Sequence, residues 1–131
     1  MSQITDHDGP TWAASDAWVL AAIACEPPKA HTLAELIAIA DAVDHNVLTE
    51  PEFNQAIGRL LSADLIEADP RADRYWPTQA GASITERWQH GAFTWASAIV
   101  PQLQRLGDPQ DTDWSLPHGV FARAVGDYLT R

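Results

Sequence analysis

The stretch Thr49–Thr78 reads TEPEFNQAIGRLLSADLIEADPRADRYWPT, and it predicts a helix followed by two short strands. Thr49 and Glu52 have the S/T-x-x-E spacing of a capping box, which marks the start of a helix. An apolar face then recurs at helical spacing, and it consists of Phe53, Ile57, Leu60 and Leu61. Two strand-like runs, 65–68 and 74–76, flank the turn-forming residues DPRAD. We expect a helix that leads into an antiparallel hairpin.

Two further helices are expected before this stretch. The first begins near Thr11 or Ser15 and ends at Cys25, because Glu-Pro-Pro follows. Its residues are nearly all apolar or small, which is typical of a helix at the centre of a fold, and Cys25 is read as a small core residue. Thr32 and Glu35 form a second capping box, which predicts another amphipathic helix ending around 41–43.

The order of these elements resembles the winged helix-turn-helix regulators of the MarR and PadR type. A Leu-rich helix end (LSADLIEAD), a turn and then YWPTQAG follow one another as in those families. Tyr75, Thr78 and Gly81 match the family's Tyr-x-x-Thr-x-x-Gly motif, and the resemblance covers roughly residues 15–91. It implies a mainly α fold with a small antiparallel β-hairpin, described as a winged helix-turn-helix plus C-terminal helices. It also implies a DNA-binding transcriptional regulator.

On the expected third helix, the inward-facing apolar residues leave a polar set towards solvent, namely Asn54, Gln55, Arg59 and Ser62. Asn and Gln pair with adenine edges and Arg pairs with guanine, so these side chains suit contacts with double-stranded DNA. Arg71 and Arg74 in the hairpin turn are expected to reach phosphates or the minor groove. The chain departs from the family here, because that helix and the wing are usually rich in basic residues.

Charge favours an alternative function. The 131 residues carry a formal net charge of −10, and residues 1–57 hold nine acidic residues against one basic, Lys29. Such a surface repels a polyanion at long range and attracts a basic partner. The alternative is therefore an acidic winged-helix protein–protein interaction module that does not bind DNA.

The chain reads as one domain with segments of different character. These are a flexible tail (1–10), a winged-helix core (11–79), a long or kinked helix (80–106), a loop (107–117) and a C-terminal amphipathic helix (118–131). Within the long helix a stripe repeats at spacings of three and four residues, and its large members are Ile84, Trp88, Trp95 and Ile99. We expect this stripe to pack on the wing domain or on a second copy of the chain, as a dimer surface, with the wall of a ligand pocket as the alternative.

Several classes of function lack support in the sequence. The chain has no Gly-rich phosphate loop, HExxH, CxxC or nucleophile elbow, so we expect no catalytic residues, no metal site and no cofactor. The five histidines are scattered and are read as surface or capping residues. No apolar run is long enough to span a bilayer, and the single cysteine fits a reducing compartment. The expected location is cytoplasmic.

Overall fold

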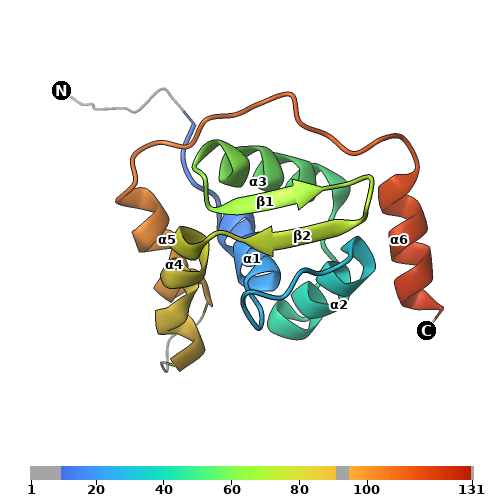
Figure 1. Ribbon diagram of the computed structural model, residues 1–131, viewed down its shortest axis with the longest axis horizontal. Helices are drawn as coiled ribbons and strands as arrows, with labels where there is room; N and C mark the ends of the chain where they lie inside the picture. Colours follow the sequence, from blue (N-terminus) through green and yellow to red (C-terminus); the bar gives the residue numbers. More distant parts are fainter. Residues whose placement is uncertain (1–9, 91–94, 131) are drawn as a thin grey trace.

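The computed structural model describes residues 10–90 and 95–130, and side chains are described outside residues 87–97. The described part is mainly helical, with one two-stranded hairpin (Figure 1). The helices are α1 (Ala14–Ile23), α2 (Leu33–Asp44), α3 (Glu50–Ser62), α4 (Gln79–His90), α5 (Trp95–Gln104) and α6 (Val120–Leu129); the strands are β1 (Ile66–Asp69) and β2 (Arg74–Pro77). The expected mainly α fold with a small antiparallel hairpin is confirmed.

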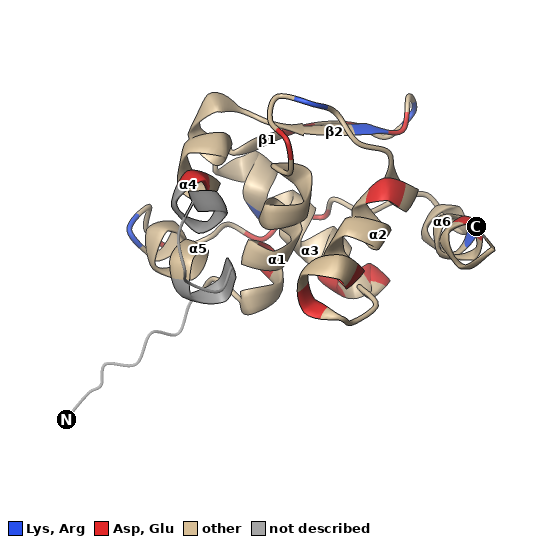
Figure 2. Ribbon diagram, turned by 90° about the horizontal axis from the view of Figure 1, so that it is seen from below, with Lys and Arg blue, Asp and Glu red and all other residues tan. Residues whose placement is uncertain are grey.

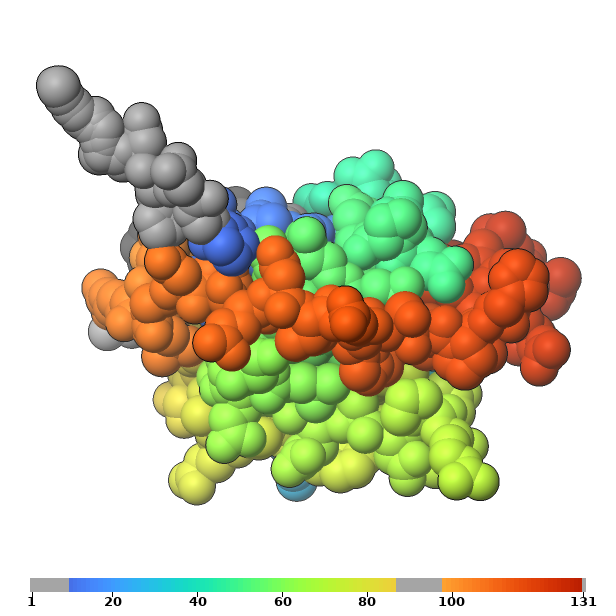
Figure 3. All heavy atoms as spheres, turned by 90° about the horizontal axis from the view of Figure 1, so that it is seen from above, coloured from blue at the N-terminus to red at the C-terminus, as the bar shows by residue number. Residues whose placement is uncertain are grey.

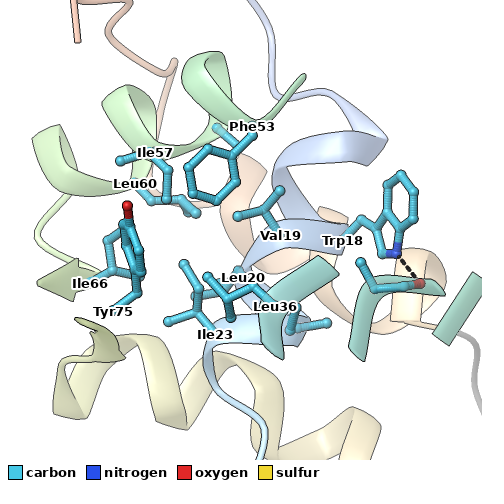
Figure 4. Packing of buried hydrophobic residues seen from close by; sticks show 14 of the residues in the cluster. Trp18, Val19, Leu20, Ile23, Leu36, Phe53, Ile57, Leu60, Ile66 and Tyr75 are labelled. Carbon is cyan, nitrogen blue, oxygen red and sulfur yellow. Dashed lines mark hydrogen bonds between the residues drawn. The ribbon is translucent and has the colours of Figure 1, made fainter. Parts of the chain in front are cut away.

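Helix α1 lies at the centre of the molecule and packs against α2, α3 and α5. Every residue from Asp16 to Ala24 is buried, as expected for a helix with almost no polar side. Phe53, Ile57 and Leu60 of α3 point towards α1 and the hairpin in the core (Figure 4). The inward face expected for α3 is therefore confirmed.

Both expected capping boxes are present. The Thr32 hydroxyl accepts from the backbone N–H of Glu35 at 3.1 Å, and Glu35 Oε1 accepts from the N–H of Thr32 at 2.8 Å. Thr49 and Glu52 make the same reciprocal pair at the start of α3, with distances of 3.4 and 3.0 Å. These bonds satisfy N–H groups that a helix start otherwise leaves without partners.

The hairpin pairs β1 with β2 in antiparallel register, so that Ala68 lies opposite Tyr75. On the other side of β2, His31 forms a bridge with Tyr75, and each backbone N–H donates to the other's carbonyl, at 2.8 and 2.9 Å. The segment before α2 thus acts as a third, one-residue strand. Tyr75, the middle partner, is buried and packs edge-on against Phe53.

The second half of the chain contains more elements than its sequence pattern indicated. The stretch 80–106, expected as one long or kinked helix, contains α4 and α5, which pack against each other. The expected loop at 107–117 and the C-terminal helix are both present. The expected flexible tail falls outside the described residues except for Pro10. None of the described helices is long and apolar enough to cross a membrane.

Candidate functional site

The face of α3 expected to meet a partner is covered by another part of the chain. Residues 107–118, which we call the strap, leave the end of α5, cross the molecule beside α3 and lead into α6 (Figures 1 and 3). The backbone N–H of Leu116 donates to Asn54 Oδ1 at 3.3 Å. Trp114 packs edge-on against Phe53, with ring centroids 6.2 Å apart. The solvent-facing position expected for Asn54 is therefore occupied by the strap.

Gly58 shows how closely the strap approaches. A Cβ atom at this position would lie 2.4 Å from the Thr112 hydroxyl and 3.6 Å from Thr112 Cβ. The first distance is far below van der Waals contact, so an added side chain at this position would have to push the Thr112 hydroxyl aside. Gly58 is buried although it lies on the polar side of α3.

Arg59 is buried, so the expectation that it faces solvent, where it could contact DNA, is wrong in this structure. The residue is 5% exposed. Its guanidinium donates through Nη1 to Asp16 Oδ2 and to the Thr11 carbonyl, both at 2.8 Å, and through Nε to Asp111 Oδ1 at 2.6 Å. A guanidinium suits this position because its fixed fork of donors serves several acceptors at once.

The ion cluster Asp16–Arg59–Asp111 joins α1, α3 and the strap. Asp16 is fully buried, and its second oxygen, Oδ1, has no hydrogen-bond partner among the described residues. Burial alone would lower the pKa of Arg59, but the hydrogen bonds and charges of Asp111 and Asp16 outweigh it and raise that pKa. Arg59 therefore stays charged and holds both carboxylates.

The remaining residues of the expected DNA-contacting set do not join Arg59. Gln55 and Ser62 lie on a narrow exposed stripe of α3. Arg71 and Arg74 are exposed at the hairpin, where Arg74 Nη1 donates to the carbonyl of Asp73 at 3.0 Å. The set is thus divided among a covered site, an open stripe and the hairpin turn.

The expected dimer or ligand stripe is divided as well. Ile99 is fully buried and Ile84 is 8% exposed, and both belong to the hydrophobic core. These two residues therefore pack inside the fold, one of the expected arrangements, and do not contribute to an outer surface in this structure. The side chains of Trp88 and Trp95 lie outside the described part of the chain.

The turn between α2 and α3 carries an exposed surface with the features of a docking site. Val47 is 51% exposed at the rim of a hollow of about 340 Å³, which Trp18, Asp44, Asn46 and Glu52 also line. Figure 2 shows acidic segments gathered at this end of α2 and α3, apart from the basic segments of the hairpin. An exposed apolar side chain with carboxylates around it suits a partner that brings basic groups.

His31 lies in a different environment from the one its sequence indicated. It is 3% exposed rather than a surface or capping residue, because its backbone pairs with β2. Its Nε2 lies 2.8 Å from the Cys25 carbonyl, and its Nδ1 lies 3.7 Å from Glu35 Oε1. A surface hollow of about 340 Å³ opens beside Cys25 and Glu35.

The residues around this hollow favour neither a reactive thiolate nor a metal site. Burial, and then the charge of Glu26, raise the pKa of the Cys25 thiol, so the reactive thiolate is disfavoured. Among the described residues, no group of three or more His, Cys, Asp or Glu side chains is placed to hold a metal ion.

Sequence reasoning missed Asp16 and Asp111, the two partners of Arg59. They lie 43 and 52 residues from Arg59 along the chain, so no local spacing indicates the contact. One signal was present. Asp16 is the one charged residue between Thr11 and Cys25, and a carboxylate on a fully buried helix requires a cationic partner.

In comparisons with known proteins, no family model, no curated sequence and no solved structure matches this chain.

Proposed function

We propose that this chain is a winged-helix protein–protein interaction module that does not read DNA with α3. The observation that carries this proposal is the position of the strap over the polar side of α3. Recognition of base edges requires a helix to enter the major groove, which is about 12 Å wide. With the strap in place, α3 offers only a narrow stripe that includes Gln55 and Ser62.

The winged-helix assignment is supported by the order of the elements. Three helices precede the hairpin, and the bridge at His31 adds a short strand to the edge of β2. This arrangement fits the resemblance found in the Tyr75, Thr78 and Gly81 motif. Packing explains why the last motif position is a glycine: a Cβ at Gly81 would lie 2.0 Å from the Leu65 carbonyl oxygen.

Electrostatics favours a protein partner over a nucleic acid. Phosphate contacts supply much of the affinity for DNA, and each one requires a cation. With Arg59 paired inside, the hairpin contributes only Arg71 and Arg74, on a chain of net charge −10. The hollow lined by Val47, Asp44, Thr49 and Glu52 is instead suited to a basic protein surface with an apolar centre. Glu50, the first residue of α3, directly follows Thr49 and adds a further carboxylate beside it.

Charge reversal provides the test of the acidic surface. We compare purified wild-type chain, Glu50→Lys and Glu67→Lys as bait for partners from the source cells. Both substitutions change the net charge equally, but Glu67 lies on β1, outside the proposed surface. A genuine partner is expected to bind the wild type and Glu67→Lys in stoichiometric amount and to be lost with Glu50→Lys. Equal loss or equal retention in both variants counts against this surface.

DNA binding is tested separately by fluorescence polarisation with mixed-sequence duplexes at low salt. We expect no saturable binding. Binding that disappears in the double variant Arg71→Ala/Arg74→Ala would instead support a DNA-binding regulator that uses its wing, and it would overturn the proposed module.

A further inference from the structure

The strap binds α3 in the manner of an extended peptide. It contains no helix or strand between residues 107 and 117, and most of its side chains are exposed. Its anchors along α3 are the Asp111 carboxylate, the Trp114 ring, the Leu116 backbone N–H and the buried Leu116 side chain. At its start, the Gly107 carbonyl accepts from Trp12 Nε1 at 2.8 Å, and Pro109 is buried. A ligand held by few anchors can be exchanged for another that carries the same anchors.

The surface beneath the strap has its own recognition chemistry. Arg59 has a side chain 6% exposed and faces the Asp111 side chain, which is 53% exposed. The buried half of the pair therefore belongs to α3 and the accessible half belongs to the strap. Asn54 presents a carbonyl oxygen to a backbone N–H, and Gly58 lets an extended chain approach the helix.

The rest of the fold does not depend on the strap for its connections. α1 contacts α2, α3, α5 and the hairpin directly, and α4 packs on α5. Movement of the strap would uncover Phe53 and leave Arg59 with Asp16 as its remaining carboxylate. Such an open state keeps the packing of α1 against α2, α3 and α5 but removes Leu116 from the hydrophobic core. It also leaves Arg59 without the Asp111 carboxylate and Phe53 without the Trp114 ring.

We propose that the strap is a displaceable ligand of its own α3, and that an extended acidic segment of a partner protein binds the same face in its place. The pattern that fits is a carboxylate three residues before an indole, with an aliphatic residue two positions further, as in Asp111, Trp114 and Leu116. The strap thereby keeps this second surface closed until such a partner is present.

A partner segment fits this exchange better than the strap of a second copy. Two identical chains that trade straps form the same contacts they already have, and they lose translational freedom on association. A foreign segment can add contacts that the strap does not make. This proposal goes beyond the proposed function and uses a different surface, so either can fail alone.

The test uses a fluorescein-labelled peptide of residues 107–118 as the probe. The tethered strap competes at an effective concentration in the millimolar range, so the intact wild type is expected to bind the probe weakly. Asp111→Asn removes the charged anchor from the tethered strap, while the probe retains it. We expect this variant to bind the probe about tenfold more tightly than the wild type, the difference that about 1.4 kcal/mol produces. The matched control is Asp113→Asn, an exposed strap carboxylate, which is expected to behave as the wild type.

A disulfide lock gives an independent measurement. The Cβ position at Gly58 lies 3.6 Å from Thr112 Cβ, within the range that disulfides span. Gly58→Cys/Thr112→Cys is made in a Cys25→Ser background. Both forms are measured with a probe that carries Thr112→Ala, because the Thr112 hydroxyl is the atom that a Cβ at position 58 would meet. The oxidised form is expected to exclude this probe; the reduced form is expected to bind it, because its own strap is no longer held by the disulfide. Circular dichroism verifies the fold of each variant. If folded Asp111→Asn and the folded reduced protein bind the probe no better than the wild type, the proposal is overturned. Probe binding by the oxidised form also overturns it.

Discussion

At the scale of single residues, Arg59 is a buried charge, and a buried charge is stable only when it has partners. Removing two ions from water is costly, and the attraction between them offsets that cost only with good geometry and further hydrogen bonds. Arg59 and Asp16 meet this condition at 2.8 Å, with the Thr11 carbonyl and Asp111 as additional acceptors. Removing one member is therefore expected to cost more than removing both.

The first prediction concerns this pair. Asp16→Asn is expected to lower the free energy of unfolding by about 3 kcal/mol, because it leaves Arg59 buried beside a neutral group. The double variant Asp16→Leu/Arg59→Met replaces both ions with apolar side chains and is expected to lose less than Asp16→Asn alone. Urea denaturation followed by circular dichroism measures both. If the double variant is less stable than Asp16→Asn, the ion pair stabilises the fold by more than the cost of leaving one charge without its partner, and the prediction is wrong.

The second prediction is that Glu35 makes the free energy of unfolding depend on pH. The hydrogen bond from the Thr32 backbone N–H is the main cause that lowers its pKa from the ordinary value of 4.5. A carboxyl whose pKa is lower in the folded chain stabilises the fold above its unfolded pKa and loses that effect as pH falls through the folded pKa. The stability difference between wild type and Glu35→Gln is therefore expected to be larger at pH 7 than at pH 3. Parallel urea titrations at the two pH values measure it, and an unchanged difference would contradict the prediction.

At the scale of elements, the sequence predicted the helix starts and the hairpin, because these features depend on residues close together in the chain. The capping boxes at Thr32 and Thr49 and the apolar spacing of α3 are set within one or two turns, so the sequence was sufficient for them. The hairpin followed from its turn residues. The stretch 80–106 was expected as one long or kinked helix, interrupted at Gly91 and Pro101. That it forms two helices, α4 and α5, which pack against each other was not predicted, because local spacing does not show this packing or the contact of α5 with α1.

Glycines inside two helices provide the third prediction. In α4, an added Cβ at Gly81 would lie 2.0 Å from the backbone oxygen of Leu65, which no side-chain rotation relieves. Gly81→Ala is expected to destabilise the fold by about 2 kcal/mol, because strain exceeds the gain in helix propensity. In α6, no atom of the described residues lies within 4 Å of the Cβ position at Gly126, so Gly126→Ala is the matched control. It is expected to stabilise the fold by up to about 1 kcal/mol. Thermal unfolding of the two variants should shift in opposite directions, and shifts of the same sign would refute this account.

At the scale of the whole molecule, the sequence could not show which surface the C-terminal segment covers. The loop character of 107–117 was correctly predicted, but its path across α3 depends on contacts with residues 52 and 62 positions away. Helical periodicity alone therefore places Asn54 and Arg59 towards solvent. The excess of acidic residues, in contrast, is a property of composition, and it remains the strongest indication from sequence about the kind of partner.

The fourth prediction follows from that excess. A chain of net charge −10 repels itself in its compact state, and added salt screens exposed charges beyond a Debye length of about 10 Å at 0.1 M. The buried Arg59–Asp16 pair is screened much less, so salt is expected to relieve repulsion without weakening it. Raising NaCl from 20 to 200 mM should therefore increase Tm by about 3 °C, the shift that somewhat less than 1 kcal/mol produces in a domain of this size. Asp64→Asn/Glu67→Gln/Asp113→Asn removes three exposed charges and should reduce the response to salt. A Tm that falls as salt is added would instead show that attractive surface pairs outweigh the net repulsion.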